Sequence, residues 1–321
     1  MSTDRTILTI ALGGNAILQS DQDGTSEDQR LNVRNAMKPI SEIIAEGSYK
    51  LIMTHGNGPQ VGALMIQQED SDRVPPQDMD IIGSMTQGQI GYMLKQELQK
   101  LLTKKGIDIP IAPVINQVLV DKDDPEFSGD NASKPVGPFY TEEEAKKMEE
   151  TRGYMVKKVA NNGERQWRRV VPSPEPIDNL GKDAITRMVK EGIIVITSGG
   201  GGIPVMYDEN DELKGVPAVI DKDKAGEKLA ELVGADVYLI LTDVDKVRLN
   251  YGEPDEEPID KMSLDEAQQY MEEGHFMEGS MKPKVESAMR FLQSGGKKAI
   301  IASLENAREA LENGAGTHIY K

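Results

Sequence analysis

Short apolar runs rich in Ile, Val and Leu recur along the chain, and most of them are far enough apart to leave room for a helix. They cover residues 7–12, 51–53, 111–114, 193–196, 237–241 and 299–301. Continuous apolar runs of this length are typical of strands that are covered on both faces, as in a parallel sheet. The pattern therefore predicts a buried, mainly parallel sheet.

A second pattern fills the segments between these runs, where apolar residues stand three and four positions apart with charged residues between them. The segments are 32–46, 88–104, 183–191, 225–233, 264–273 and 284–293. This spacing is typical of helices with one buried face, so the alternation predicts an open α/β sheet with helices on both faces. Ligands of such sheets bind beyond the carboxyl ends of the strands, and the turns that follow the strands are the first place to look for chemistry.

One polar segment, from residue 121 to about 172, interrupts the alternation. It is rich in Pro, Gly and charged residues, and it contains the only tryptophan, Trp167. An excursion of this length in a compact domain is usually a lid, a binding subdomain or an oligomer contact. We therefore expect a single domain over 1–321, with an N-terminal half (1–176) that includes the excursion and a C-terminal half (177–321).

Composition removes several functional classes. Of 321 residues, 38% are hydrophobic and 28% charged, which argues against a disordered chain or a rod. The absence of cysteine excludes disulfides, thiolate nucleophiles and cysteine metal sites. With 37 Lys and Arg against 54 Asp and Glu, the formal charge of −17 disfavours nucleic acid and anionic membranes as partners. No run has the form of a membrane span or a secretory signal, so a cytoplasmic location is expected.

Three of the predicted strands run straight into glycine clusters. The clusters are Gly13-Gly14-Asn15, Gly56-Asn57-Gly58 followed by Gly62, and the four glycines at 199–202. Glycine at a strand end lets backbone N–H groups approach an anion closely, and a helix that begins there adds a favourable dipole. Any one cluster taken alone is better explained as a tight turn. Three in one sheet predict a phosphate site, most strongly at the four consecutive glycines.

The common nucleotide and hydrolase motifs are missing. The chain has no GxxxxGK[ST], and GNGPQVG departs from GxGxxG because its third glycine comes one residue late. These differences disfavour a P-loop hydrolase and a dinucleotide oxidoreductase. HExxH and GxSxG are also missing, and three scattered histidines predict no metal site. A packing or surface role is the better interpretation for His275 and His318, whereas His55 lies inside a glycine turn.

Lysines beside carboxylates are the next candidates, because phosphoryl transfer requires positive charge near the transferred group and the leaving β-phosphate. Lys222 stands between Asp221 and Asp223 directly after an apolar run, and Lys284 follows GSMKP at the start of a predicted helix. In a chain of charge −17, these lysines would let an anionic nucleotide bind. A solvated surface charge is the ordinary interpretation of any single lysine, but the alternation with aspartates favours a site at Lys222.

Several long and unusual strings occur in one order along essentially the whole chain. They are ALGGNAIL, THGNGPQVG, MTQGQIGY, KPVGPF, WRRVVPSPEPID, SGGGGIPV, AVIDKDKAGEKLAELV, LTDVDKV, NYGEPDE and GHFMEGSMKPKVESA. In this order they resemble the carbamate kinases of the amino acid kinase superfamily. KPVGPF, VPSPEPID and GHFxxGSMxPK are similar to segments that separate carbamate kinases from acetylglutamate, aspartate and uridylate kinases, which share the sheet and its glycine turns.

The resemblance implies a three-layer α/β/α sandwich, the amino acid kinase fold, with a mainly parallel open sheet and a subdomain protruding over the acceptor site. The excursion at 121–172 fits that subdomain. The implied activity is reversible, Mg²⁺-dependent phosphoryl transfer between ATP and carbamate, giving ADP and carbamoyl phosphate, with ATP formation in arginine breakdown. Carbamate is already a nucleophilic anion, so direct in-line transfer needs no general base. Family members pair through the N-terminal half, and a homodimer is therefore expected.

The resemblance also assigns roles to individual residues. Those that line the acceptor and the transferring phosphoryl group are Gly13, Gly14, Asn15, Gly56, Asn57, Gly58, Gly200 and Gly201. Those assigned to catalysis are Lys134, which reaches down from the subdomain, Lys222 and Lys284, which stabilise the phosphoryl group and the β/γ bridge, and Asp223, which orients the lysines. Those that border the nucleotide are Thr242, Asp243 and Val244, with Lys222 and Lys284. Mg²⁺ is expected on the β- and γ-phosphates with several waters, without a carboxylate cage.

Two other functions stay open on the sequence. One is a sibling kinase that acts on another carboxylate or on a nucleotide, and the other is a non-catalytic sensor of nucleotides or metabolites with the same fold. A sensor predicts loss of the lysines, yet Lys134, Lys222 and Lys284 are all present. Two departures from the family pattern, Asp243 where some relatives have glycine and Lys282 before a proline, bear on nucleotide affinity more than on the reaction.

Overall fold

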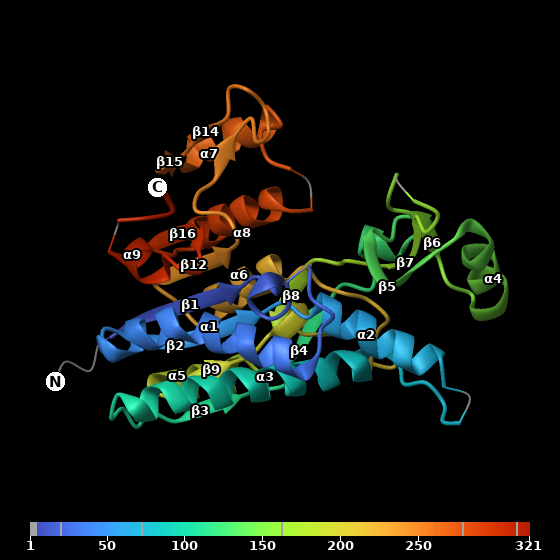
Figure 1. The fold of residues 1–321 in the computed structure, drawn as a ribbon, viewed down its shortest axis with the longest axis horizontal. Coiled ribbons are helices and arrows are strands. Elements are labelled where there is room, and N and C mark those ends of the chain that lie inside the picture. Colours follow the sequence, from blue (N-terminus) through green and yellow to red (C-terminus); the bar gives the residue numbers. More distant parts are fainter. Residues whose placement is uncertain (1–4, 20, 72, 162, 278, 313) are drawn as a thin grey trace.

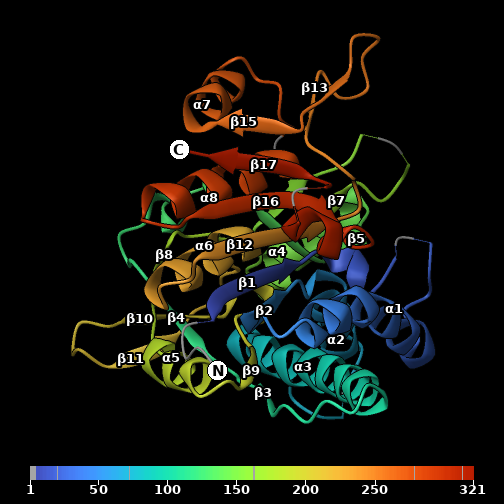
Figure 2. The same cartoon turned by 90° about the vertical axis from the view of Figure 1, so that its left-hand side faces the viewer.

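A mainly parallel sheet forms the centre of the structure, a computed structural model that describes residues 5–19, 21–71, 73–161, 163–277, 279–312 and 314–321. Within these residues the sheet has eight strands in the order β15-β17-β16-β12-β1-β2-β9-β3, from top to bottom in Figure 2. Their bounds are β15 (Lys261–Ser263), β17 (Thr317–Tyr320), β16 (Lys298–Ser303), β12 (Val237–Thr242), β1 (Thr6–Leu12), β2 (Tyr49–His55), β9 (Ile194–Ile196) and β3 (Ile111–Pro113). Neighbours are parallel except β16 and β17. All six apolar runs predicted as strands lie in this sheet.

Helices cover both faces of the sheet and create three layers. On one face lie α1 (Ser26–Ala45), α3 (Met79–Lys104) and α9 (Ala307–Leu311), and on the other lie α5 (Lys182–Lys190), α6 (Lys222–Leu232) and α8 (Met281–Gln293). In β1, Leu8, Ile10 and Leu12 pack in the first layer and Ala11 in the second, because successive side chains of a strand point to opposite faces. Burial of both faces explains the continuous apolar runs. The predicted α/β/α architecture is confirmed.

Helix α1 begins at Ser26, six positions before the predicted start at residue 32. Its first turn is fixed by a capping box, in which the Asp28 backbone N–H donates to the Thr25 hydroxyl (3.1 Å) and the Thr25 backbone N–H donates to the Asp28 carboxylate (3.0 Å). Such a box satisfies backbone donors that have no partner inside the helix. The helix therefore begins at its polar cap, before the first residues that show the apolar spacing.

Helices α3 and α2 also depart from the predicted pattern. Helix α3 begins at Met79 instead of the predicted residue 88. Its first turns carry exposed apolar side chains, including Ile81 and Met85. These side chains obscure the spacing of the buried residues, and the sequence pattern therefore misses the first turns. Helix α2 (Gly58–Glu69) is not predicted at all, since GNGPQVG has the composition of a turn. Pro59 fits its first turn, where a backbone N–H has no helical partner.

A second, smaller sheet and several short elements complete the body. This sheet has the order β11-β10-β4-β8, with β11 (Leu213–Gly215), β10 (Ile203–Tyr207), β4 (Gln117–Val120) and β8 (Pro176–Asn179). The short elements are α7 (Leu264–Glu272), the hairpin strands β13 (Arg248–Leu249) and β14 (Glu257–Pro258), and 3₁₀ turns at Gly14–Ala16, Pro125–Phe127 and Gly199–Gly201. Strands of two to five residues carry too few positions for a sequence pattern. In the described ranges, none of the helices combines the length and the apolar character that a membrane crossing requires.

The polar excursion contains a small sheet and a helix that project from the body, drawn in green at the right of Figure 1. The elements are β5 (Lys134–Tyr140), α4 (Glu142–Arg152), β6 (Val156–Lys158) and β7 (Trp167–Val171), with the sheet order β5-β7-β6. We call them the subdomain. Its Val136 and Val171 pack with Val61 and Met65 of α2, so an apolar contact joins the subdomain to the body. The subdomain therefore stands beside the carboxyl ends of the strands.

The glycine turn after β9 packs directly against the turn after β2. A Cβ at Gly199 would overlap the His55 ring, and a Cβ at Gly200, whose φ is 64°, would overlap the Asn57 side chain. His55 is almost fully buried, and its Nδ1–H donates to the Gly56 carbonyl (2.9 Å). Burial lowers the pKa of His55 to about 4, so the ring is neutral at pH 7. His55 thus fixes the two turns by packing, which is a structural role.

Gly200→Ala tests this close packing. The added methyl group meets both a left-handed backbone and the Asn57 side chain, so we expect a loss of about 2–3 kcal/mol in unfolding free energy. The matched control is Gly234→Ala, since Gly234 has a φ of 67° but no atom within 4 Å of its Cβ position. The control should lose only the strain of about 1 kcal/mol. Denaturant titration measures both values, and equal losses would contradict the proposed overlap.

Candidate active site

The turns after β1 and β2 touch at the carboxyl edge of the central sheet. The Gly13 N–H donates to the Leu241 carbonyl at the end of β12 (3.0 Å), and the Gly56 N–H donates to the Leu12 carbonyl (3.2 Å). A Cβ at Gly56 would stand 3.3 Å from the Gly14 backbone. The absence of side chains lets these two turns form one backbone surface.

Two lysines from different helices share one buried carboxylate beside this surface. Lys222 begins α6 and Lys284 lies in the first turn of α8. Their ammonium groups bind the two oxygens of Asp223, at 2.5 Å and 3.0 Å. Asp223 is 2% exposed. The Lys222 Cδ would stand 3.4 Å from a Cβ at Gly56, so this side chain lies against the second glycine turn.

A buried tyrosine beneath α6 holds the two helices in register. The Tyr238 hydroxyl donates to the Asp223 carbonyl (3.0 Å), and its ring packs on Phe291 of α8 with ring centres 5.6 Å apart. A Cβ at Gly226 would stand only 2.7 Å from the Tyr238 hydroxyl oxygen. The lack of a side chain at Gly226 therefore lets the Tyr238 hydroxyl reach the Asp223 carbonyl and fix the position of the first turn of α6.

The charges of this cluster favour the binding of an anion. Burial lowers the pKa of Lys284, repulsion from Lys222 lowers it further, and Asp223 opposes both effects. An anion between the ammonium groups would relieve their repulsion. The geometry therefore creates a place where negative charge is favoured.

The third predicted lysine, Lys134, approaches from the subdomain. It is the first residue of β5, and its ammonium group donates to the Asp221 carboxylate (2.9 Å). Asp221 is also the residue that caps α6. The two are 87 positions apart, and no spacing in the sequence signals that they meet. In the sequence, Asp221 counts only as one of the two aspartates that flank Lys222, and the resemblance assigns it no role.

The residues predicted to border the nucleotide lie together around two adjoining cavities. The larger cavity, of about 460 Å³, contains both lysines of the cluster, and its predicted lining residues are Gly13, Gly14, Asn15, Lys222, Thr242, Asp243 and Lys284. The smaller, of about 130 Å³, shares Asp243 and is also lined by Val244, Tyr251 and Met277. The Asn15 amide donates to the Asp243 carboxylate (3.1 Å). This bond joins the first glycine turn to the end of β12.

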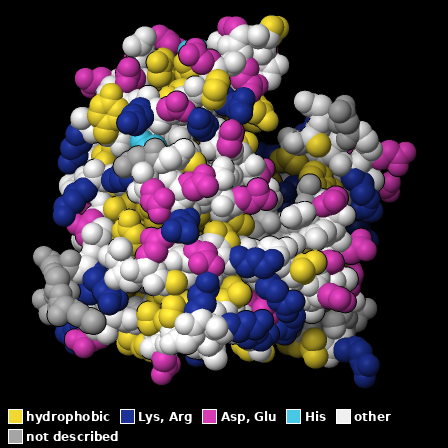
Figure 3. Space-filling model, turned by 60° about the vertical axis from the view of Figure 1, so that its left-hand side comes forward, with side chains coloured by type: hydrophobic (Ala, Val, Ile, Leu, Met, Phe, Trp, Pro, Cys, Tyr) yellow, Lys and Arg dark blue, Asp and Glu magenta, His cyan; other side chains and the backbone are white. Residues whose placement is uncertain are grey.

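A third cavity, of about 1070 Å³, lies between α2 and the subdomain. It is lined by the predicted Asn57, Gly58 and Lys134, and also by Gln60 and Arg168, which the sequence patterns do not single out. Figure 3 shows a hollow between the body and the projecting subdomain, on a face where acidic and basic side chains are interspersed. Lys134 and the second glycine turn therefore face the same space.

The predicted Gly200 and Gly201 occupy a different place. Among the described residues they do not line the three cavities, and Gly201 is buried. A Cβ at Gly201 would overlap the Ile220 carbonyl, directly before Asp221. Together with the contact between Gly200 and Asn57, this close approach joins the turn after β9 to the start of α6. Gly200 and Gly201 therefore pack behind the site, against Asn57 and the residue that precedes Asp221.

Comparison with known proteins gives a consistent result. Residues 6–303 match the model of the amino acid kinase family. The carbamate kinase of Thermococcus kodakarensis is 53% identical over 317 residues, which are 98% of this chain and 99% of that protein. The carbamate kinase of Clostridium perfringens is 46% identical over 319 residues, covering 98% and 99%. The structure of a carbamate kinase from Giardia lamblia bound to AMP-PNP is 39% identical with a TM-score of 0.92 and covers 100% of both chains. The chain therefore belongs to the amino acid kinase family and, within it, to the carbamate kinases.

Proposed function

We propose that the protein transfers a phosphoryl group reversibly between ATP and carbamate, with ADP and carbamoyl phosphate as the other pair. The observation that carries this proposal is the pair of ammonium groups held on Asp223 beside the glycine turns. They line a cavity of about 460 Å³ that adjoins the predicted nucleotide border. Lys134 lines a separate cavity under the subdomain, which suits the acceptor.

The transfer is a direct in-line displacement. A carbamate oxygen attacks the γ-phosphorus of ATP, the bond to the β–γ bridging oxygen breaks, and ADP leaves with the electron pair. The attacking group is already an anion, so the step requires no proton acceptor. Lys222 and Lys284 stabilise the charge on the phosphoryl oxygens and the bridge, and Asp223 holds both lysines in place. The N–H groups of Gly13 and Gly56 already donate to carbonyls, so other backbone N–H groups of the first two glycine turns bind the transferred group.

The two halves of the chain divide the substrates in this proposal. Residues 1–176, with the subdomain, bind carbamate or carbamoyl phosphate, and residues 177–321 bind the nucleotide. The cavity between α2 and the subdomain supports the first assignment, and the border residues at the end of β12 support the second. The turn after β1 lines the nucleotide-side cavity, so we place the phosphoryl group where the halves meet.

A Mg²⁺ ion bound with the nucleotide would neutralise part of the phosphate charge while keeping most of its water. Asp243 and Glu305 line the nucleotide-side cavity, where their carboxylates can accept hydrogen bonds from those waters. Both oxygens of Asp223 accept hydrogen bonds from lysines, so in the proposal the role of this residue is to orient the two lysines. Formation of ATP in arginine breakdown and a cytoplasmic location stay predictions of the sequence.

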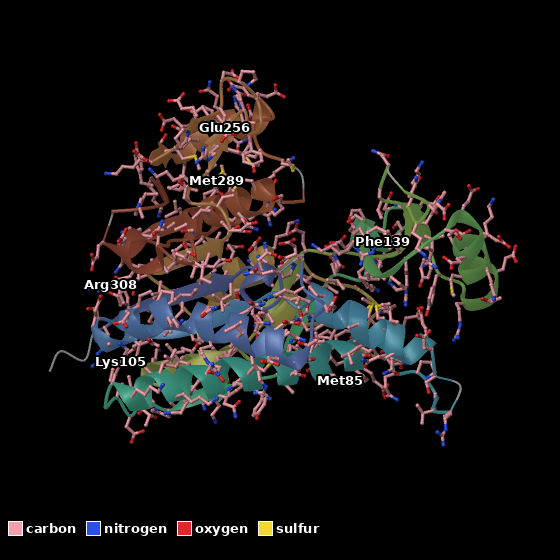
Figure 4. All side chains as sticks on the ribbon, viewed as in Figure 1. Met85, Lys105, Phe139, Glu256, Met289 and Arg308 are labelled. Atoms are coloured by element: carbon pink, nitrogen blue, oxygen red, sulfur yellow. The ribbon has the colours of Figure 1, made fainter. Side chains whose placement is uncertain are left out.

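The exposed face of α3 supports the predicted homodimer. Ile81, Met85 and Tyr92 lie on α3 at spacings of four and seven, and they are 43%, 41% and 51% exposed. Such spacings place side chains on one face of a helix. Figure 4 shows Met85 at the outer side of α3, away from the subdomain. We propose that this face pairs with the same face of a second copy.

The reaction itself is tested with the purified protein. ADP and carbamoyl phosphate should give ATP, EDTA should abolish the reaction and added Mg²⁺ should restore it. Acetylglutamate, aspartate and UMP should not be phosphorylated by ATP. A luciferase assay for ATP and a coupled assay for ADP measure these activities. UMP phosphorylation without activity on carbamoyl phosphate would contradict the proposal.

Lysine substitutions test the assignment of charges. Lys222→Ala and Lys284→Ala remove interactions that strengthen in the transition state, so kcat should fall about 100-fold, or about 2.7 kcal/mol, with little change in KM. Lys134→Ala should also raise the KM for carbamoyl phosphate. The control is Lys228→Ala, since Lys228 lies on the same helix and pairs with Glu231. A Lys284→Ala enzyme within about threefold of the unaltered kcat would show the assignment to be wrong.

The dimer is tested by a charge on the exposed face of α3. Met85→Lys should convert a dimer into a monomer, because burying an unpaired ammonium group in an apolar interface is costly. Light scattering at micromolar concentration measures the mass. The control is Ile177→Lys, another exposed apolar position (48%) that lies outside α3. A monomeric mass for the unaltered protein would refute the dimer.

A further inference from the structure

We propose that Asp221 is a positioning residue, which holds the ammonium group of Lys134 at the start of α6 and so fixes the subdomain over the acceptor cavity. The inference rests on the proposed function for the role of Lys134. It adds Asp221 to the residues on which that function depends. Asp221 acts through Lys134 and α6 and touches no reacting atom in this proposal.

The two oxygens of Asp221 have separate partners. One oxygen accepts the backbone N–H of Asp223 (2.9 Å), which caps α6, and the other accepts Lys134 Nζ (2.9 Å). The same carboxylate therefore sets the first turn of the helix that presents Lys222 and Asp223 and the direction of the lysine from the subdomain. One side chain links the lysines of the body to the lysine of the subdomain.

The surroundings of Asp221 keep this link charged. Its side chain is 17% exposed and that of Lys134 is 36% exposed. Burial raises the pKa of Asp221, but attraction to Lys134 and Lys222 outweighs burial and brings the pKa to about 2. The carboxylate stays ionised across the physiological range, and charge-assisted bonds of this kind are stronger than neutral ones.

The link leaves Lys134 able to bind an anion. An ammonium group has three N–H donors, and Asp221 accepts from one of them, so the others remain for carbamate or carbamoyl phosphate. Without a carboxylate at position 221, the four-carbon stem of Lys134 could adopt many rotamers, and ordering it would cost free energy when the substrate binds. Asp221 removes that cost before binding. The predicted effect therefore falls on the acceptor more than on the nucleotide.

Substitutions at position 221 can separate the cap from the lysine contact. Asn caps helices about as well as Asp, but with its single oxygen on the Asp223 N–H it presents an NH₂ group to Lys134. Ser also caps a helix and is too short to reach the lysine. Asp221→Asn and Asp221→Ser therefore keep the cap and remove the link, so two independent variants can be compared at similar stability.

The experiment is a double-mutant cycle with Lys134→Ala, assayed as ATP formation from ADP and carbamoyl phosphate. Asp221→Asn should raise the KM for carbamoyl phosphate about tenfold and leave the KM for ADP within about twofold. In the Lys134→Ala background the same substitution should change kcat/KM by less than about twofold, because the partner is gone. Equal effects in the two backgrounds, or equal rises in both KM values, would overturn the proposal.

A second readout needs no activity. Hydrogen exchange of the backbone amides of β5 other than its two prolines should be faster in Asp221→Asn and in Asp221→Ser than in the unaltered protein, because a contact between subdomain and body is lost. The control is Asp208→Asn, since Asp208 also accepts backbone N–H groups and a lysine, in the hairpin of β10 and β11. It should leave exchange in β5 unchanged. Unchanged exchange in both Asp221 variants would overturn the positioning role. An unaltered protein that makes no ATP would instead refute the proposed function.

Discussion

Two ammonium groups from different helices can stand beside each other because the carboxylate of Asp223 lies between them. Unit charges about 4 Å apart near a protein surface repel by roughly 4 kcal/mol, so Lys222 and Lys284 would separate if this carboxylate were lost. Asp223 is itself buried and depends on the two lysines for compensation. The three groups therefore form a unit, and the fold must bring α6 and α8 to the same point. Tyr238 and Phe291 provide that packing from below.

The glycine turns depend on close approach between segments that are distant in the sequence. A Cβ at Gly56 would make a tight contact with the Gly14 backbone, and a Cβ at Gly200 would overlap the Asn57 side chain. Strands β1 and β2 therefore end at one backbone surface, against which Lys222 lies, and the turn after β9 packs behind it. A neutral, buried His55 stabilises this arrangement by packing and one hydrogen bond. The floor of the site is built from close backbone contacts, and Lys134 reaches the start of α6 from the subdomain.

Much of this fold could be predicted from the sequence, because strands covered on both faces appear as continuous apolar runs. The start of α1 was harder to predict, since a polar cap at Thr25 precedes the residues with apolar spacing. Helix α2 begins with the Gly-Pro composition of a turn. The meeting of Lys134 with Asp221 could not be predicted, because it depends on the path of a whole subdomain. The two lysines that the motif resemblance assigns to catalysis, Lys222 and Lys284, line one cavity together with Thr242 and Asp243.

The position of β1 has a consequence for biosynthesis. This strand is made first, yet it pairs with β12 on one side, and the Ile7 N–H donates to the Asp236 carboxylate across 229 positions of sequence. During translation one edge of β1 therefore remains unpaired until β12 has been synthesised. Unpaired apolar strand edges promote association between nascent chains. Non-local pairing of this kind also slows folding. The same pairing brings the Leu241 carbonyl to the Gly13 N–H, so a chain truncated before β12 leaves one edge of β1 unpaired and lacks the contact that fixes the first glycine turn.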